Sequence, residues 1–109
     1  MISWEDFKKL DIRTGTIIEA LPFEKAKKPA YKLKIDFGKV GTKNSSAQIT
    51  SLYESNELIG KQIIAVINFP AKQIADFMSE CLVLGIYNEN KDVILLQPER
   101  KTGNGNKIG

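Results

Sequence analysis

Hydrophobic and polar side chains alternate most regularly between Tyr31 and Phe37. The odd-numbered positions of this stretch carry Tyr, Leu, Ile and Phe, whereas Lys32, Lys34 and Asp36 occupy the even-numbered positions. Successive side chains of a β-strand point to opposite faces of the sheet. The alternation therefore predicts a half-buried strand with a wet, basic outer face.

The residues after this strand predict a hairpin. Gly38 and Gly41 permit a turn, because glycine adopts backbone angles that other residues avoid. The chain then returns through residues 45–49, which place Ala47 and Ile49 on the apolar side. Once paired, the two strands would present four polar side chains on one surface, a candidate binding platform: Lys32, Lys34, Ser46 and Gln48.

The N-terminal residues predict a short docking helix followed by a long strand. Ser3 is placed to cap the helix, and Trp4 and Phe7 fall on one of its faces, where we expect them to pack against the body. Residues 12–24 are rich in β-branched side chains. Gly15 within them predicts the sharp bend that small closed barrels need.

The remaining chain alternates between short elements and turns. We expect a short helix in residues 51–60, a covered central strand in 61–69, a short helix or ordered loop in 71–79, and a hairpin of strands 80–87 and 92–97. In the tail, Asn104 and Gly105 predict a turn, and Ile108 is placed to dock on the body.

About six strands, a few short helices and a bend in the first strand predict an all-β fold. A five-stranded Greek-key barrel of the oligonucleotide/oligosaccharide-binding (OB) type fits best, with a helix between its third and fourth strands and an additional C-terminal hairpin and tail. In such barrels ligands lie across strands two and three, which here carry the candidate platform.

Composition narrows the function classes. The 109 residues, 42% of them hydrophobic, suit one domain spanning residues 1–109. There is no histidine, and the single cysteine, Cys81, lies in an apolar run, so the commonest general base and metal ligand are missing. We expect no catalysis, no cofactor, no metal and no small-molecule substrate, and we expect Cys81 to be a buried thiol in a reducing compartment.

The charge distribution and the N-terminus bound the possible partners. A net charge of +3 permits a nucleic-acid partner but equally suits a solvated surface. Lys25, Lys27 and Lys28 form a loop at the barrel rim, either a solvated turn or an edge that contacts phosphates. Tyr31 would stack on a base if exposed, although burial in the core is the alternative. The first residues lack the apolar core of a signal peptide, and no run is long enough to enter a membrane, so we expect a soluble cytoplasmic protein.

Four motifs, in chain order, resemble the tRNA-binding-domain family. They are FKKLDIRTGTI (7–17), KLKIDFG (32–38), LIGKQIIAVINFP (58–70) and SECLVLG (79–85). That family includes free-standing tRNA-binding proteins, the C-terminal appendix of many methionyl-tRNA synthetases and a cytokine-precursor domain. The segments SSAQIT (45–50) and LLQPERKTGNGNKIG (95–109) are similar, more narrowly, to export-associated chaperones within the family.

The resemblance implies an OB barrel, a cytoplasmic homodimer, no catalysis and two candidate activities. The favoured activity is chaperone-like binding of unfolded or export-bound polypeptide. Three apolar side chains are candidates to line a peptide groove, with core packing as the alternative for each: Phe69, Phe77 and Met78. The other activity is structure-specific tRNA binding through phosphate contacts and shape, with these candidate residues: Lys32, Lys34, Ser46, Gln48, Lys72 and Ser79.

Two motifs depart from the tRNA-binding pattern. Members that bind tRNA are expected to carry a small-residue and glycine turn where this chain has Ala47, Gln48 and Ile49, and Gln48 fills space that glycine would leave open. Where tRNA-binding members are expected to carry Ser-Gln-Gly-Met, this chain has Ser79, Glu80, Cys81 and Leu82. Glu80 puts a negative charge where a phosphate backbone would approach, at a cost on the order of 1 kcal/mol even when solvated. These departures weaken the tRNA hypothesis without removing it.

Overall fold

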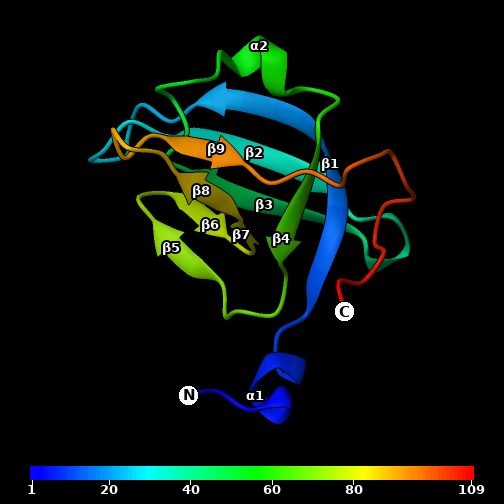
Figure 1. The fold of residues 1–109 in the computed structure, drawn as a ribbon. Helices are drawn as coiled ribbons and strands as arrows, with labels where there is room; N and C mark the ends of the chain where they lie inside the picture. Colours follow the sequence, from blue (N-terminus) through cyan, green and yellow to red (C-terminus); the bar gives the residue numbers. More distant parts are fainter.

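The computed structural model describes residues 1–109 and shows strands with a few short helices (Figure 1). The elements are α1 (Trp4–Lys8), β1 (Ile12–Pro22), β2 (Tyr31–Asp36), the 3-10 helix η1 (Gly38–Val40), β3 (Thr42–Ala47), α2 (Ser55–Leu58), β4 (Gln62–Val66), β5 (Lys72–Ile74), β6 (Phe77–Ser79), β7 (Leu82–Val83), β8 (Gly85–Tyr87) and β9 (Val93–Leu95). None of the helices has the length and apolarity needed to span a membrane.

A five-stranded antiparallel sheet in the order β3-β2-β1-β4-β7 curls into a nearly closed barrel. The helix α2 lies between β3 and β4 in the chain, and β5–β6 and β8–β9 form two separate hairpins. This arrangement confirms the predicted five-stranded OB barrel with an additional hairpin.

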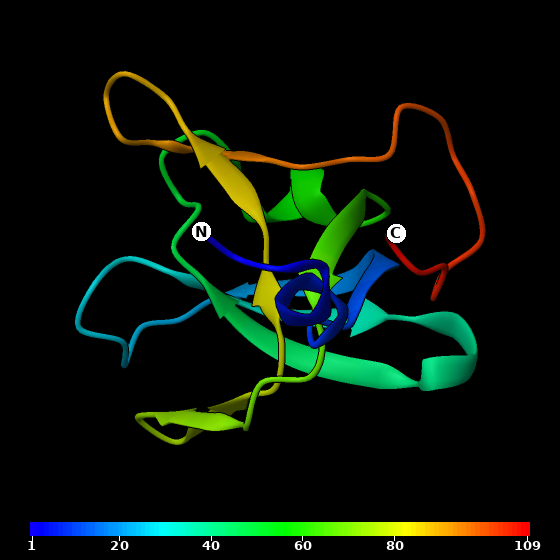
Figure 2. The ribbon, with the colours of Figure 1, turned by 60° about the horizontal axis from the view of Figure 1, so that its bottom comes forward.

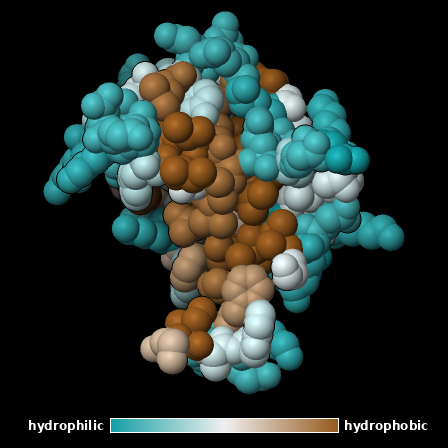
Figure 3. All heavy atoms as spheres, viewed as in Figure 1, coloured by the Kyte–Doolittle hydropathy of each residue, from teal (hydrophilic) through white to brown (hydrophobic).

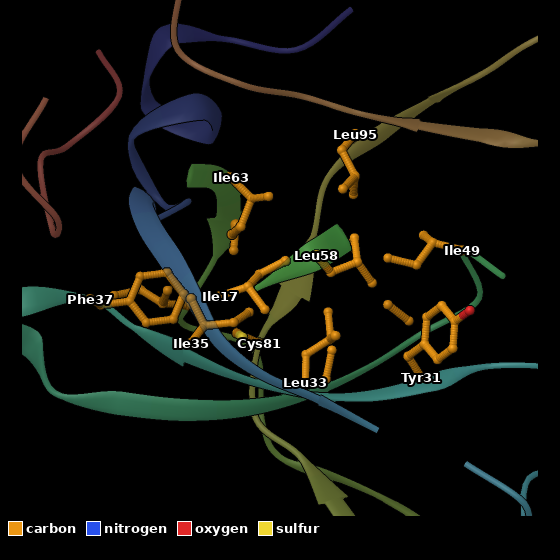
Figure 4. Packing of buried hydrophobic residues seen from close by; sticks show 14 residues of the cluster. Ile17, Tyr31, Leu33, Ile35, Phe37, Ile49, Leu58, Ile63, Cys81 and Leu95 are labelled. Carbon is orange, nitrogen blue, oxygen red and sulfur yellow. The ribbon is translucent and has the colours of Figure 1, made fainter. Parts of the chain in front are cut away.

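Every second side chain of the strand predicted from residues 31–37 lies in the core of the barrel. Leu33, Ile35 and Phe37 are at most 1% exposed, whereas Lys34 on the opposite face is exposed. Leu58 from α2 is fully buried in the same cluster (Figure 4). The alternation along this stretch therefore predicted both the strand and the face that it buries.

Two tyrosines are anchored by hydrogen bonds at one end of the core. Tyr31 is buried, and its hydroxyl donates to the Tyr53 carbonyl at 2.7 Å. The Tyr53 hydroxyl in turn accepts from the Leu95 amide at 3.1 Å, which ties β9 to the barrel. Tyr31 is thus a core residue and has no face available for stacking on a base.

Gly15 does not form the predicted bend. The register between β1 and β2 shifts between Ile17 and Glu19, so the bulge lies farther along β1. A Cβ atom at Gly15 would stand 2.7 Å from the side chains of Ile35 and Phe37. Glycine is needed at position 15 because two core side chains lie directly against its backbone.

The prediction of a helix or loop in residues 71–79 was wrong. β5 and β6 form a hairpin in which Ile74 pairs with Phe77 across a turn at Ala75 and Asp76. Ala75 has a φ of 52°, as such tight turns require. A cross-strand pair places Ile74 and Phe77 on one face, as helical spacing also would, so the apolar pattern did not distinguish the two.

Two predicted strands are shorter than expected. The central strand β4 ends at Val66, which leaves Phe69 51% exposed. The stretch 80–87 divides into β7, which pairs with β4, and β8, which pairs with β9. The predicted hairpin therefore comprises only β8 and β9.

The cap of α1 is as predicted, but its docking is not. The Ser3 hydroxyl accepts from the Asp6 amide at 3.1 Å, and the Asp6 carboxylate accepts from the Ser3 amide at 3.1 Å. No residue of α1 is buried, and Trp4 is 82% exposed. The helix precedes β1 in the chain and projects beyond the end of the barrel (Figure 1). In Figure 2, α1 therefore stands in front of the barrel.

The C-terminal tail docks along β1, as the position of Ile108 predicted. The Gly105 amide donates to the Thr14 carbonyl at 2.7 Å, and the Ile108 amide donates to the Ile12 carbonyl at 2.8 Å. Gly105 lies in the predicted turn with a φ of 83°, and a Cβ atom there would meet the Phe37 carbonyl oxygen. The tail therefore adds backbone hydrogen bonds to the first strand.

Cys81 is buried, so the rate at which its thiol is alkylated tests whether the chain is folded as described. Cys81 is 6% exposed, and desolvation raises the pKa of its thiol from 9.0 to about 11. At pH 8 about one thiol in a thousand would be ionised. We expect iodoacetamide to alkylate Cys81 in the native protein about a hundredfold more slowly than in the urea-unfolded chain, because the thiolate is the nucleophile.

Mass spectrometry of timed samples would measure this difference, and equal rates would contradict it. The native state also holds the thiol proton more tightly than the unfolded chain. The contribution of Cys81 to stability is therefore complete below pH 9 and is lost as the pH rises toward 11.

Candidate functional site

The edge of β3 is joined by a short seam of hydrogen bonds to Ser79, the last residue of β6, and to Glu80, which follows it. The Ser46 amide donates to the Ser79 hydroxyl at 3.0 Å, and the Asn44 amide donates to the Glu80 carboxylate at 2.9 Å. The Glu80 amide donates back to the Asn44 carbonyl at 2.8 Å. Side chains of Ser79 and Glu80 thus stand where a neighbouring strand would pair with β3, and this seam ends at Ser46.

The seam gives Glu80 a structural role. Its carboxylate lies in the position that was expected to oppose a phosphate backbone, but it is half-buried and accepts the Asn44 amide. Glu80 therefore has a structural role in closing the barrel. No group of three His, Cys, Asp or Glu side chains is arranged to hold a metal ion.

Four of the six candidate RNA-binding side chains meet in one groove of about 560 Å³ between β3 and the β5–β6 hairpin. They are Ser46, Gln48, Lys72 and Ser79. Phe69 and Leu82 add apolar walls, and Glu80 lines the same space. We call this space the mixed groove, since it offers hydrogen-bonding, charged and apolar contacts together.

Lys32 and Lys34 lie outside the mixed groove. The Lys32 ammonium sits 5.6 Å from the centre of the Phe23 ring and 6.0 Å from that of Phe77, a cation–π arrangement. The Lys34 ammonium lies 4.0 Å from the Glu19 carboxylate. Both lysines are on the outer face of β2, as predicted, but each already has a partner within the chain.

A basic groove of about 600 Å³ adjoins the mixed groove. It lies between the loop after β1 and the β5–β6 hairpin, which project on the same side of the molecule (Figure 2). Its cationic lining consists of Lys25, Lys27, Lys28 and Lys72.

Only Lys25 of these four is paired. Its ammonium lies 2.8 Å from the Asp76 carboxylate, and this contact raises the pKa of Lys25 and lowers that of Asp76. Lys27, Lys28 and Lys72 make no ion pair within the chain. The Lys25–Asp76 pair joins the two walls of the basic groove and leaves three cations for an anionic ligand.

A third groove, of about 360 Å³, has no charged lining residue. It separates the end of β3 from β7 and β8, and we call it the uncharged slot. Its lining comprises Ser46, Ala47, Gln48, Ile49, Leu82, Val83, Leu84, Gly85, Tyr87 and Val93. Ser46 and Gln48 are common to the uncharged slot, the mixed groove and the basic groove.

The three candidate peptide-binding side chains do not form one site. Phe69 is exposed and lines the mixed groove. Phe77 packs edge-on against Phe23, with ring centres 5.4 Å apart, and is half-buried. Met78 is 46% exposed, and alternation along β6 points it to the opposite face from Phe77.

An apolar band that the sequence did not single out covers one face of the barrel. Figure 3 shows it running over β8, β9, β7 and β4 down to α1. Exposed Leu82, Ile86 and Ile94 belong to these strands. The signal was present in the run CLVLGI, which is apolar at successive positions and so supplies apolar side chains to both faces of short strands.

Comparisons with known proteins agree with this architecture. The model of the putative tRNA binding domain family matches residues 12–107. The chain is 37% identical over 108 residues to the methionine–tRNA ligase of Methanococcoides burtonii, covering 99% of this chain and 16% of that enzyme. The chain spans about a sixth of the length of the curated relatives it matches.

Two crystal structures are similar over their whole length. The chaperone CsaA from Bacillus anthracis str. Ames is 53% identical, with a TM-score of 0.95 covering 100% of this chain and 99% of that one. The CsaA chaperone protein from Picrophilus torridus is 56% identical, with a TM-score of 0.94 covering 100% of both chains. With its barrel and its match over residues 12–107, the chain belongs to the family of putative tRNA-binding domains.

Proposed function

We propose that this chain is a non-enzymatic, cytoplasmic binding protein that holds unfolded or export-bound polypeptides. The observation that carries the proposal is the apolar band, whose exposed Leu82 lines the mixed groove together with the exposed Phe69. The full-length similarity to two CsaA chaperones supports a chaperone-like activity.

The physical basis is a match between two apolar surfaces. An unfolded polypeptide exposes side chains that a folded protein buries, so a protein that holds it needs apolar surface accessible from solvent. Phe69 is 51%, Leu82 49% and Ile86 55% exposed. Large apolar side chains gathered on one face mark interaction sites on soluble domains.

We expect the Phe69→Ser/Leu82→Ser double variant to suppress aggregation of an unfolded client poorly. Burial of each side chain against a client contributes about 1.5–3 kcal/mol, so the affinity should fall about tenfold or more. Light scattering of a chemically denatured client after dilution would measure the effect.

A matched control is Leu52→Ser, because Leu52 is 44% exposed and lines none of the three grooves. The charge reversals Lys32→Glu and Lys34→Glu should also leave the suppression intact. Equal suppression by the double variant and the unsubstituted protein would argue against polypeptide binding in the mixed groove.

The proposal includes a homodimer that covers α1. A five-residue helix is far shorter than the roughly 12 residues at which isolated helices become even marginally stable, so α1 gains order from a partner surface. Ile2 is 76% and Trp4 82% exposed, and with Phe7 and Gly109 they line an apolar groove of about 610 Å³. A two-fold contact through α1 would bury the same residues on both copies.

Sedimentation velocity should show a dimer at micromolar concentrations. Trp4→Ala should weaken it about tenfold or more, because a symmetric contact loses the indole on both sides. Leu52→Ala is the matched control, since it removes an exposed apolar side chain elsewhere. An unsubstituted chain that sediments as a monomer throughout the micromolar range would exclude the dimer.

A second candidate function is tRNA binding, favoured by the basic groove. Lys27, Lys28 and Lys72 make no ion pair within the chain and lie near Ser46 and Gln48, which can donate further hydrogen bonds. Cations that neutralise phosphates release counterions, which makes such binding strong at low salt. The match to the putative tRNA binding domain supports this candidate. Lys32, Lys34 and Ser79 would extend the contact along the neighbouring surface.

We expect the affinity for tRNA to fall steeply with salt and Lys72→Glu to weaken it. Removal of one phosphate contact should reduce the slope of log K against log salt by about 0.7–0.9. Lys101→Glu carries the same charge change outside the grooves and should have a smaller effect. Fluorescence anisotropy with labelled tRNA and unstructured RNA as competitor measures both quantities; a flat salt dependence would count against the candidate.

A further inference from the structure

The uncharged slot is bounded by strand edges that lack partners. On one side the seam between β3 and residues 79–80 ends with the bond from the Ser46 amide to the Ser79 hydroxyl. Gln48 lies two residues farther along the same edge and is exposed, and neither its backbone amide nor its backbone carbonyl makes a hydrogen bond to another backbone group. Its amide and carbonyl are therefore available to an incoming chain, because alternate residues of β3 present their backbone groups away from β2.

The opposite side of the slot presents a second free edge. In the β8–β9 hairpin the Leu96 amide donates to the Leu84 carbonyl at 3.2 Å, and the Asn88 amide donates to the Asp92 carbonyl at 2.9 Å. Hydrogen-bonded pairs of an antiparallel ladder recur every second residue, so Gly85 on β8 directs its backbone groups away from β9. The same holds for Tyr87, and both residues line the slot.

The chemistry of the slot selects its occupant. Two rows of backbone donors and acceptors match an extended main chain, which presents the same groups on its two sides. Leu82, Leu84 and Val93 line the slot with exposed or half-buried apolar side chains, which suit every second side chain of such a segment. With no charged lining residue, the slot offers no counterion to a phosphate backbone, in contrast to the adjoining basic groove.

The ends of the chain itself are engaged elsewhere. The C-terminal tail is hydrogen-bonded along β1 through Gly105 and Ile108. The N-terminal residues form α1, which precedes the start of β1. Neither segment lines the slot, so no part of this chain competes for the free edges.

We propose that the uncharged slot binds an extended, uncharged polypeptide segment as an added β-strand between the end of β3 and β8. This inference rests on the proposed polypeptide-binding function and specifies how the ligand is recognised. Main-chain hydrogen bonds to Gln48 and to β8 provide the affinity for any sequence, and the apolar lining selects segments with an apolar residue at every second position.

The test uses the full-length protein and a fluorescent, end-capped peptide of about eight alternating valine and threonine residues. A set of copies, each N-methylated at one successive position, removes one backbone donor at a time. Successive amides of a strand point alternately to its two edges, so a strand in the slot turns one set toward β8 and the other toward Gln48. We expect N-methylation to weaken binding about fivefold at a run of consecutive positions inside the slot, and to have no effect at the peptide ends outside it.

The protein side is probed at Gln48. Gln48→Pro removes the free amide and should weaken peptide binding about fivefold, whereas Gln48→Ala keeps the amide and should bind within twofold of the unsubstituted protein. Hydrogen exchange of the Gln48 amide in the unsubstituted protein provides a readout that does not depend on the folding of the proline variant. This amide should become protected when the peptide is added.

Each alternative outcome overturns the inference in a distinguishable way. Peptide binding that no N-methylation weakens, with an unprotected Gln48 amide, would place the polypeptide elsewhere and leave the proposed function standing. Protection of the Gln48 amide without peptide, rising with protein concentration, would assign the slot to a second copy. Protection by tRNA and not by peptide would assign it to RNA. If neither peptide nor unfolded client binds, the proposed function fails with the inference.

Discussion

The fold depends on how the backbone groups along the edge of β3 are satisfied. A barrel removes strand edges by closing on itself, and this one closes between β3 and residues 79–81 through side-chain and backbone hydrogen bonds. Because Ser79 and Glu80 supply side chains in place of a full strand ladder, the closure stops at Ser46. The opening beyond it, together with the exposed hairpins, creates the surfaces on which binding can occur.

Three grooves of different chemistry therefore share two residues. Ser46 and Gln48 line the basic groove, the mixed groove and the uncharged slot, so ligands in adjoining grooves would meet at these positions. The lysines of the basic groove favour binding of an anionic ligand, whereas the apolar lining of the uncharged slot favours binding of a neutral extended chain. The two proposed ligands would compete for Ser46 and Gln48, while their other contacts lie in separate grooves. A single fold can accommodate both ligands in this way.

Sequence patterns predicted the features that depend on residues close together in the chain. Features that depend on tertiary contacts could not be predicted in this way. The alternation from Tyr31 to Phe37 located β2 and its buried face, because the period of a strand is a local property. It could not assign the role of Gly15, which follows from two core side chains of another strand. Ile74 and Phe77 were ambiguous because a tight hairpin and a helix turn place such residues on the same face.

The candidate site was predictable only in part for the same reason. Ser46, Gln48, Lys72 and Ser79 converge because β5–β6 folds over β3. Lys32 instead contacts the rings of Phe23 and Phe77, and Lys34 contacts Glu19. The tail carries a further consequence, for the order of folding. Arg13 donates to the Gly105 carbonyl at 2.9 Å across 92 positions of sequence. During synthesis β1 cannot form this contact until residue 105 has been made, so the first strand of this barrel is the last to be completed.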